Sequence, residues 1–306
     1  MARSFCMKSD IMKISIEEVR TMGSGLVWPK GVVATDGGIV YAVDARGCCS
    51  HITSDGITSF FGTLGGTPNG ICLDERGNCI IANMSSGEVQ LLFSDGRHEV
   101  MLAEEQGEMI FSPNFPFLDL HERLWVSCSV DYPYLDPSSR PPIPVGCLIL
   151  IGKGEQPRIA AKDVLLINGV VLDEEEKFVY VAETMMRRIL RFPINEDNSL
   201  GAKEVYGPED LGPKGFPGGI AFDEAGNLWI AFPSANAVGF IDPNGKLEMF
   251  LEDPKGLILS TPTDICFGGK DRKTAFIGSL GCTNIPCFEV PYSGVRLIHQ
   301  ACKYSS

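Results

Sequence analysis

Polar side chains recur at two fixed points of a repeated phrase in this sequence. The first point opens an apolar run, and it is occupied in turn by Lys30, Asn69, Asn114, Asn168, Gly218 and Thr263. The second point ends the following apolar run, and it is occupied by Asp44, Asn83, Ser127, Glu183 and Ser279, with Phe232 as the apolar exception. Amides, carboxylates and an ammonium can bind a small polar molecule, move a proton and stabilise an oxyanion. The simpler interpretation is that these asparagines and aspartates cap the turns of each repeat.

The two points recur because the phrase occurs six times, beginning at Pro29, Pro68, Pro113, Ile167, Pro217 and Pro262. Each copy contains short apolar runs bounded by glycine-rich turns, a pattern typical of β-hairpins. A strand-rich repeat of roughly 40–50 residues indicates a β-propeller with one blade per copy. We therefore predict an all-β, six-bladed β-propeller with four antiparallel strands per blade. Its central channel brings both sets of polar residues together.

The repeats leave no room for a linker, so we expect a single domain over residues 1–306, with residues 1–13 as a candidate disordered end. The run from Ile14 to Arg20 is expected to supply the last strand of the sixth blade. Such an N-terminal strand closes the ring and removes its open edges.

Three aromatic residues are candidates for contact with a cyclic or aromatic substrate. Phe115 and Phe232 fall at or beside the channel-facing points of their repeats. Tyr134 belongs to the proline-rich insertion 131–142, which is stiff and long enough to overhang the channel as a lid. The alternative for this insertion is a plain surface excursion.

The overall charge and hydropathy exclude two classes of partner. A net charge of −13 argues against nucleic acid, because phosphate binding needs a concentrated basic surface. The longest apolar run, Cys147 to Ile151, is far too short to cross a bilayer, and no cleavable apolar segment follows Met1. We expect a cytoplasmic protein, monomeric or dimeric, whose partner is a small-molecule substrate, with no nucleic acid and no membrane.

Three stretches carry a resemblance to a known family. They are Ile167-Asn168-Gly169, the run from Gly218 to Ala231, and Phe267-Gly268-Gly269-Lys270-Asp271. On these residues the chain, from about Gly23 onward, resembles the senescence marker protein / gluconolactonase / luciferin-regenerating-enzyme-like propellers, which include regucalcin. The resemblance implies a lactonase or related hydrolase. It also implies one divalent cation in the channel, held by a Glu, two Asn or an Asn and a water, and an Asp.

This chain departs from that ligand set at both charged positions. Asn114 and Asn168 match the two asparagines, and they are the metal ligands if a metal is retained. Lys30 (or Ser24 in a shifted alignment) stands where the family has Glu, and Gly218 stands where it has Asp. A hard dication normally needs a carboxylate. The cofactor is therefore either none or one divalent cation (calcium, magnesium, zinc or manganese), with Glu183, Asp44 or Asp264 as possible replacement ligands.

Without a metal, Lys30 can do the electrostatic work of the lost cation by polarising a carbonyl oxygen. Asn69, Asn114 and Asn168 would bind the substrate, and Glu183 or Asp44 would act as general base. Two other roles for Lys30 stay open. It can form a Schiff base if it is desolvated, or it can form a buried ion pair with Asp44 or Glu183.

The sequence thus predicts a small-molecule hydrolase that opens a lactone or another cyclic carbonyl compound in the central channel. One alternative is a metal-free propeller enzyme of another reaction type, a condensation or C–C cleavage of the strictosidine synthase-like kind. The other is a non-catalytic ligand-binding propeller.

Overall fold

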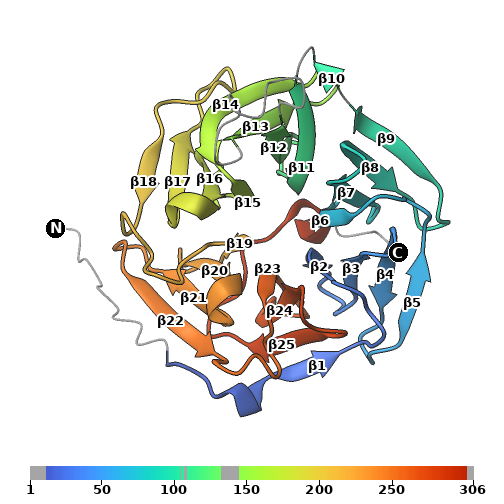
Figure 1. Cartoon of the computed structure of the whole chain (residues 1–306), viewed down its shortest axis with the longest axis vertical. Coiled ribbons are helices and arrows are strands. Elements are labelled where there is room, and N and C mark those ends of the chain that lie inside the picture. Colours follow the sequence, from blue (N-terminus) through green and yellow to red (C-terminus); the bar gives the residue numbers. More distant parts are fainter. Residues whose placement is uncertain (1–11, 104, 107–108, 132–144, 302–306) are drawn as a thin grey trace.

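Six small antiparallel sheets stand in a ring around a central axis (Figure 1). The computed structural model describes residues 12–301, apart from residues 104, 107–108 and 132–144. The first strand of each repeat lies nearest the axis, and the following strands lie successively further out (Figure 1). This arrangement confirms the predicted six-bladed β-propeller.

The first three blades follow the first three repeats. Blade one contains β2 (Val32–Ala34), β3 (Val40–Asp44), β4 (Cys48–Ile52) and β5 (Thr58–Phe61). Blade two contains β6 (Pro68–Leu73), β7 (Cys79–Asn83), β8 (Glu88–Leu92) and β9 (His98–Ala103). Blade three has a fifth strand, and it contains β10 (Glu105–Gln106), β11 (Met109–Leu118), β12 (Leu124–Asp131), β13 (Val145–Ile151) and β14 (Arg158–Leu165).

The last three blades follow the remaining repeats. Blade four contains β15 (Ile167–Leu172), β16 (Phe178–Glu183), β17 (Arg188–Pro193) and β18 (Glu204–Tyr206). Blade five contains β19 (Ile220–Phe222), β20 (Leu228–Phe232), β21 (Ala237–Ile241) and β22 (Leu247–Glu252). Blade six contains β23 (Pro262–Gly268), β24 (Thr274–Ser279), β25 (Ile285–Glu289) and the N-terminal β1 (Arg20–Met22).

The N-terminal strand closes the ring, but it begins later than the sequence suggested. β1 pairs antiparallel with β25, with Arg20 opposite Cys287 and Met22 opposite Ile285. The residues Ile16–Glu18 form a 3-10 turn instead of a strand, because Ser15 and Glu18 make a reciprocal capping box. The predicted strand from Ile14 to Arg20 is therefore corrected to Arg20–Met22.

The hydrophobic core consists of six layers, one between each pair of neighbouring blades. Successive residues of an inner strand enter different layers: Val32 packs toward blade six with Phe276, whereas Val33 packs toward blade two with Ile71. Both faces of these strands are covered, which explains why their sequences are continuously apolar rather than alternating.

The C-terminal segment, residues 295–301, crosses one end of the channel (Figure 1). This end lies opposite the turns that open each repeat. The amide of Val295 donates to Phe222 O at 2.9 Å, and Gln300 Nε2 donates to Ala34 O and Phe267 O, each at 3.2 Å. The segment, which ends in the short helix α1 (Ile298–Ala301), is thus attached to blades five, one and six. Within the described residues, no helix is long and apolar enough to cross a membrane.

Candidate functional site

The residues that open each repeat meet at one end of the channel. Asn69 Nδ2 donates to Asn114 O at 3.1 Å, and Asn114 Nδ2 donates to Ile167 O at 3.0 Å. The hydrogen bonds between neighbouring blades continue around the ring: Gly169 N donates to Gly218 O, and Gly219 N donates to Thr263 O. Thr263 Oγ1 in turn donates to Lys30 O at 2.7 Å. We call this set the mouth ring: Lys30, Asn69, Asn114, Asn168, Gly218 and Thr263.

A β-bulge directs the side chains of the mouth ring out of the sheet ladders. The pairing of the inner strand with its neighbour skips Asn69 in blade two, Asn114 in blade three, Asn168 in blade four and Thr263 in blade six. An unpaired bulge residue is free to point away from the ladder, and bulges are common beside active sites. The local fold thus presents the four side chains, although the repeat alone gave no sign of the bulges.

Glycine follows the mouth position because neighbouring inner strands approach closely there. A Cβ at Gly31 would lie 2.4 Å from Asn69 O, and a Cβ at Gly70 would lie 2.5 Å from Asn114 O. Both distances are shorter than any ordinary contact, so the backbone itself excludes a side chain. The Pro-x-Gly phrase of the sequence is a consequence of this packing.

We expect Gly70→Ala to lower the free energy of unfolding by about 1–3 kcal/mol, because the blades would have to separate to admit the methyl group. The matched control is Gly37→Ala, whose Cβ would meet Thr35 Oγ1 at an ordinary 3.7 Å. Urea unfolding of both variants checks this. Equal stability of the two variants would contradict the close approach at the mouth ring.

Lys30 contributes an uncompensated positive charge to the mouth ring. The residue is half-buried, and burial lowers the pKa of its ammonium below the usual value. No described residue forms an ion pair or hydrogen bond with its Nζ. The predicted alternative, a structural ion pair with Asp44 or Glu183, is therefore not formed, because both carboxylates have other partners.

Asp44 and Glu183 each hold the chain that enters their own blade. Asp44 accepts hydrogen bonds from the backbone N–H of Val27 at 2.9 Å and from Arg46 Nε at 2.7 Å. Glu183 accepts from Leu165 N at 2.9 Å and from Arg188 Nε at 2.6 Å.

Asn83 Oδ1 accepts in the same way from Thr67 N at 2.9 Å, whereas the Ser279 hydroxyl donates to Ser260 O. The turn-capping interpretation describes these contacts. Burial alone would raise the pKa of Asp44, but the hydrogen bonds from Arg46 and Val27 lower it. Asp44 is therefore a weak base. A catalytic role for Asp44 or Glu183 stays a prediction.

The two amides predicted as metal ligands differ in availability. Asn114 is 6% exposed, and both polar atoms of its amide are engaged: Oδ1 accepts from Asn69, and Nδ2 donates to Ile167 O. The Asn168 amide has no hydrogen-bond partner among the described residues. Asn69 Oδ1 is buried and likewise has no partner in that part of the chain. A ligand with a hydrogen-bond donor would satisfy this acceptor.

The mouth-ring residues that match the family's metal ligands do not by themselves fit a divalent cation, and Asp264 as a replacement ligand stays a prediction. Asn168 is the one amide of the matched pair that is free, Gly218 offers no side chain, and the Lys30 ammonium would repel a cation. Asp44 and Glu183 are each paired with a guanidinium. The mouth ring is instead suited to an electron-rich oxygen atom.

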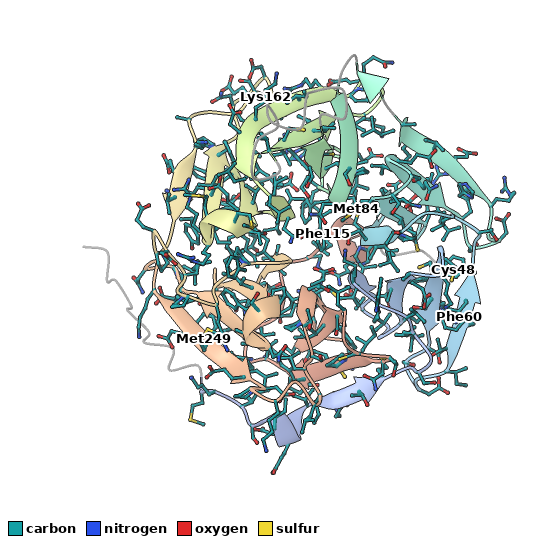
Figure 2. The ribbon with its side chains drawn as sticks, in the orientation of Figure 1. Cys48, Phe60, Met84, Phe115, Lys162 and Met249 are labelled. Atoms are coloured by element: carbon teal, nitrogen blue, oxygen red, sulfur yellow. The ribbon has the colours of Figure 1, made fainter. Side chains whose placement is uncertain are left out.

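A chamber of about 90 Å³ lies directly beneath the mouth ring. Its lining includes Phe115, Gly169 and Asp264, each of which follows a mouth-ring residue in the sequence, and its far end is lined by the C-terminal segment. Phe115 lies near the centre of the ring, whereas Phe60 and Met249 lie toward the rim (Figure 2).

Asp264 is the ionisable group at the upper end of the chamber. It is 6% exposed, and it occupies the position that carries glycine in blades one, two, four and five. Its oxygens accept from the backbone N–H groups of Val32 and Ile265, each at 2.9 Å. Burial raises the pKa of Asp264 to about 8, although these two hydrogen bonds oppose the rise.

The sequence does single out Asp264, because it replaces the glycine found at this point of four other repeats. From the sequence, however, we considered Asp264 only as a replacement metal ligand. Of the other predicted contacts, Phe232 is 1% exposed and packs in the layer between blades four and five, away from the chamber. Tyr134 and most of the predicted lid, 132–142, lie outside the described residues.

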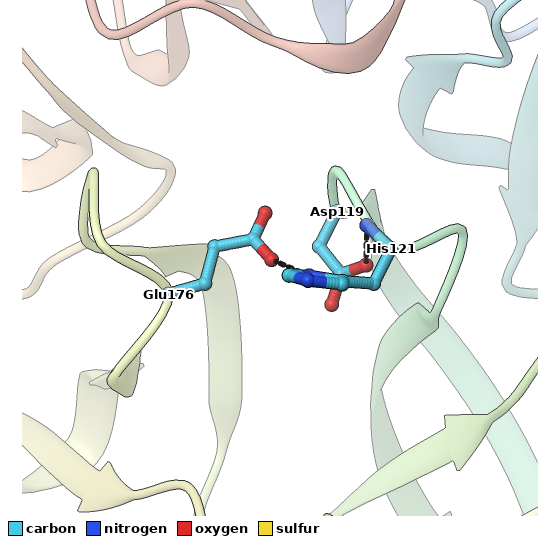
Figure 3. A group of neighbouring side chains, drawn as sticks. All are labelled: Asp119, His121 and Glu176. Atoms are coloured by element: carbon cyan, nitrogen blue, oxygen red, sulfur yellow. Dashed lines mark hydrogen bonds and ion pairs between the residues drawn. The ribbon is translucent and has the colours of Figure 1, made fainter.

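A second acidic cluster lies on the opposite face, where Asp119, His121 and Glu176 bring their side chains together from blades three and four (Figure 3). No pattern in the sequence indicated this cluster. Arg123 contacts both carboxylates, with Nε 2.6 Å from Asp119 Oδ2 and Nη2 3.3 Å from Glu176 Oε2. Asp119 also accepts from Trp125 Nε1 at 2.9 Å. The Arg123 guanidinium already pairs with both carboxylates of this cluster, so we interpret it as an ion-pair network that joins two blades.

Comparison with known proteins agrees with this fold. A 6-deoxy-6-sulfogluconolactonase of Pseudomonas putida is 28% identical over 134 residues, which are 44% of this chain and 45% of that protein. A Bacillus subtilis protein named as a sugar lactone lactonase is 26% identical over 70% of this chain and 73% of its own length. The match therefore spans about half the length of the first of these relatives.

Solved structures show the same architecture at lower identity. A gluconolactonase of Xanthomonas campestris superimposes with a TM-score of 0.73 at 18% identity, over 89% of each chain. A regucalcin of Agrobacterium tumefaciens, described as a calcium-binding protein, gives a TM-score of 0.69 at 16% identity, over 94% of this chain and 98% of that one. The family described as the SMP-30/Gluconolactonase/LRE-like region matches residues 28–281. The chain belongs to the SMP-30/gluconolactonase/LRE-like family.

Proposed function

We propose that this protein is a lactonase-type hydrolase that opens a cyclic ester at the mouth ring without a divalent cation. The observation that carries the proposal is the half-buried Lys30 ammonium, which has no acidic partner among the described residues and belongs to the same mouth ring as the free amide of Asn168. Membership of a family with lactonase-named relatives supports the reaction class.

In this mechanism Lys30 and Asn168 bind the carbonyl oxygen of the lactone. Water adds its oxygen atom to the carbonyl carbon, and negative charge develops on the carbonyl oxygen. A positive charge already in place at that point stabilises the transition state more than the ground state. The bulge in blade four places Asn168 outside the strand pairing, where its amide can reach the substrate.

Asp264 takes the role of general base that the sequence assigned to Asp44 or Glu183. Each Asp264 oxygen accepts one N–H and keeps a second acceptor position. Its carboxylate accepts the proton of the attacking water. The ring C–O bond then breaks, and the departing alkoxide takes that proton back, so the product is a hydroxy acid. Burial makes Asp264 a stronger base than Asp44, whose pKa is lowered by its hydrogen bonds.

A lactone panel in a pH-stat tests the proposal, because ring opening releases one acid equivalent. We expect turnover of at least one γ- or δ-lactone, and no turnover of linear esters at a comparable rate. Hydrolysis of no lactone in the panel would overturn the proposed function.

A second candidate is a metal-free reaction through an amine adduct. Burial lowers the pKa of Lys30 and thereby favours the nucleophilic neutral amine. A strictosidine synthase-like protein of Arabidopsis thaliana is 24% identical over 59% of this chain. Borohydride trapping of a carbonyl compound on Lys30, read by mass spectrometry, would favour this candidate over the hydrolase.

A further inference from the structure

The chamber continues directly from the mouth ring. Asn114 and Phe115, Asn168 and Gly169, and Thr263 and Asp264 are consecutive pairs in which the first residue belongs to the mouth ring and the second lines the chamber. A molecule whose carbonyl group is held at Lys30 therefore has the rest of its body directed toward this space.

The walls of the chamber are hydrocarbon over most of their height. Ile71, Phe115, Val170, Ile220 and Ile265 contribute apolar side chains. Asp264 supplies polar atoms near the top, and further ionisable residues, such as Asp173 and Arg296, occur at the far rim. The hydroxyl groups of a sugar ring would lose their hydrogen bonds to water in the middle of the chamber and would find few replacements.

The protein's own chain covers part of the far end of the chamber, where the exposed residues Leu120, Glu174 and Arg296 also line it. Val295, Leu297 and Ile298 line it, and the attachment of Val295 and Gln300 to three blades keeps the segment in place. The chamber is thus a pocket of limited volume. Its 90 Å³ has room for roughly six to nine water-sized groups.

We propose that the chamber receives an aliphatic chain of the substrate, so that the substrate class is a lactone with a hydrocarbon substituent rather than a polyhydroxylated sugar lactone. This inference rests on the proposed function for the position of the ring carbonyl. The occupant follows from the apolar walls, the continuity with the mouth ring and the limited volume.

A homologous series of 4-alkyl-γ-butyrolactones, compared with glucono-1,5-lactone, tests the inference. We expect kcat/KM to rise about three- to fourfold per added methylene group until the chain has about six carbons, and then to level off. Glucono-1,5-lactone is expected to be a poorer substrate than the hexyl lactone. Equal or faster turnover of glucono-1,5-lactone, or no dependence on chain length, would overturn the inference while leaving the hydrolase proposal intact.

A variant of the chamber wall makes the test specific. Phe115→Leu is expected to move the preferred chain about one to two carbons longer, because leucine occupies less of the chamber. The control is Phe240→Leu, a buried aromatic in the layer between blades five and six that does not line the chamber. This variant is expected to lose stability without a change in the preferred chain length. The same shift in both variants would contradict the role given to Phe115.

A binding measurement separates failure of the inference from failure of the proposed function. If no lactone is hydrolysed, the proposed function is wrong, but the chamber can still be examined with 1-alkanols from butanol to octanol. We then expect the Kd from calorimetry to fall about three- to fourfold per methylene group. No binding of any alkanol would overturn the inference by itself.

Discussion

Replacing Lys30 by methionine is expected to lower kcat/KM for a lactone substrate by about 10²–10³-fold, the usual loss when one oxyanion-stabilising group is removed. The melting temperature should stay the same or rise slightly. The ammonium has no partner among the described residues that the substitution could remove. Replacing a desolvated charge also removes the free-energy cost of burying it, which stabilises the folded state. Initial rates and thermal unfolding of the same preparation measure both effects.

Two further variants make the result interpretable. Lys255→Met removes an exposed lysine of the same charge and should leave kcat/KM unchanged. Lys30→Arg keeps the charge but cannot form a Schiff base, so it should retain more activity than Lys30→Met if the role is electrostatic. Full activity of Lys30→Met would show that the charge at the mouth ring has no part in catalysis.

Asp264→Asn is expected to lower kcat by about 10²–10⁴-fold, because it removes the general base. In the wild type, kcat should rise as the pH passes about 8, where burial places the pKa of Asp264. The variant should lose this rise. An exposed turn residue provides the control, since Asp271→Asn should keep both the rate and its pH dependence.

The same substitution also has a predicted effect on stability. Burial raises the folded-state pKa of Asp264 to about 8, above the unfolded value near 4. The folded protein therefore holds a proton that the unfolded chain releases in this range. The contribution of Asp264 to stability is complete below about pH 4 and declines toward pH 8 by about 1.4 kcal/mol per pH unit.

Urea unfolding at pH 6, 7 and 8 should show this decline in the wild type and a smaller one in Asp264→Asn. Identical pH profiles of rate and stability in the two proteins would contradict the assignment.

The sequence was sufficient to predict the ring, because the propeller repeats one local pattern. The Pro-x-Gly phrase marks where inner strands meet, and glycine is required there by the backbone of the next blade, as at Gly31 and Gly70. The start of the closing strand was predicted too early. Ser15 and Glu18 form a capping box, which favours a helical turn over the strand that the apolar residues suggested.

The chemistry of the site was harder to predict than its location. Asp44 and Glu183 occur at the expected point of the repeat, but the repeat does not reveal that Arg46 and Arg188 neutralise them. Such partners depend on side-chain geometry within one blade. The position of the C-terminal segment at the chamber depends on contacts between residues far apart in sequence, such as Gln300 with Ala34. The repeat period carries no information about these contacts.

The central claim is that the charge of Lys30 replaces a metal at the mouth ring. The most direct measurement is kcat/KM for a hydrolysed lactone before and after exhaustive dialysis against EDTA, with elemental analysis of the same sample and add-back of calcium, magnesium, manganese and zinc. We predict less than stoichiometric metal, and activity that neither EDTA nor add-back changes. Loss of activity on chelation, restored by one of these ions, would contradict the claim.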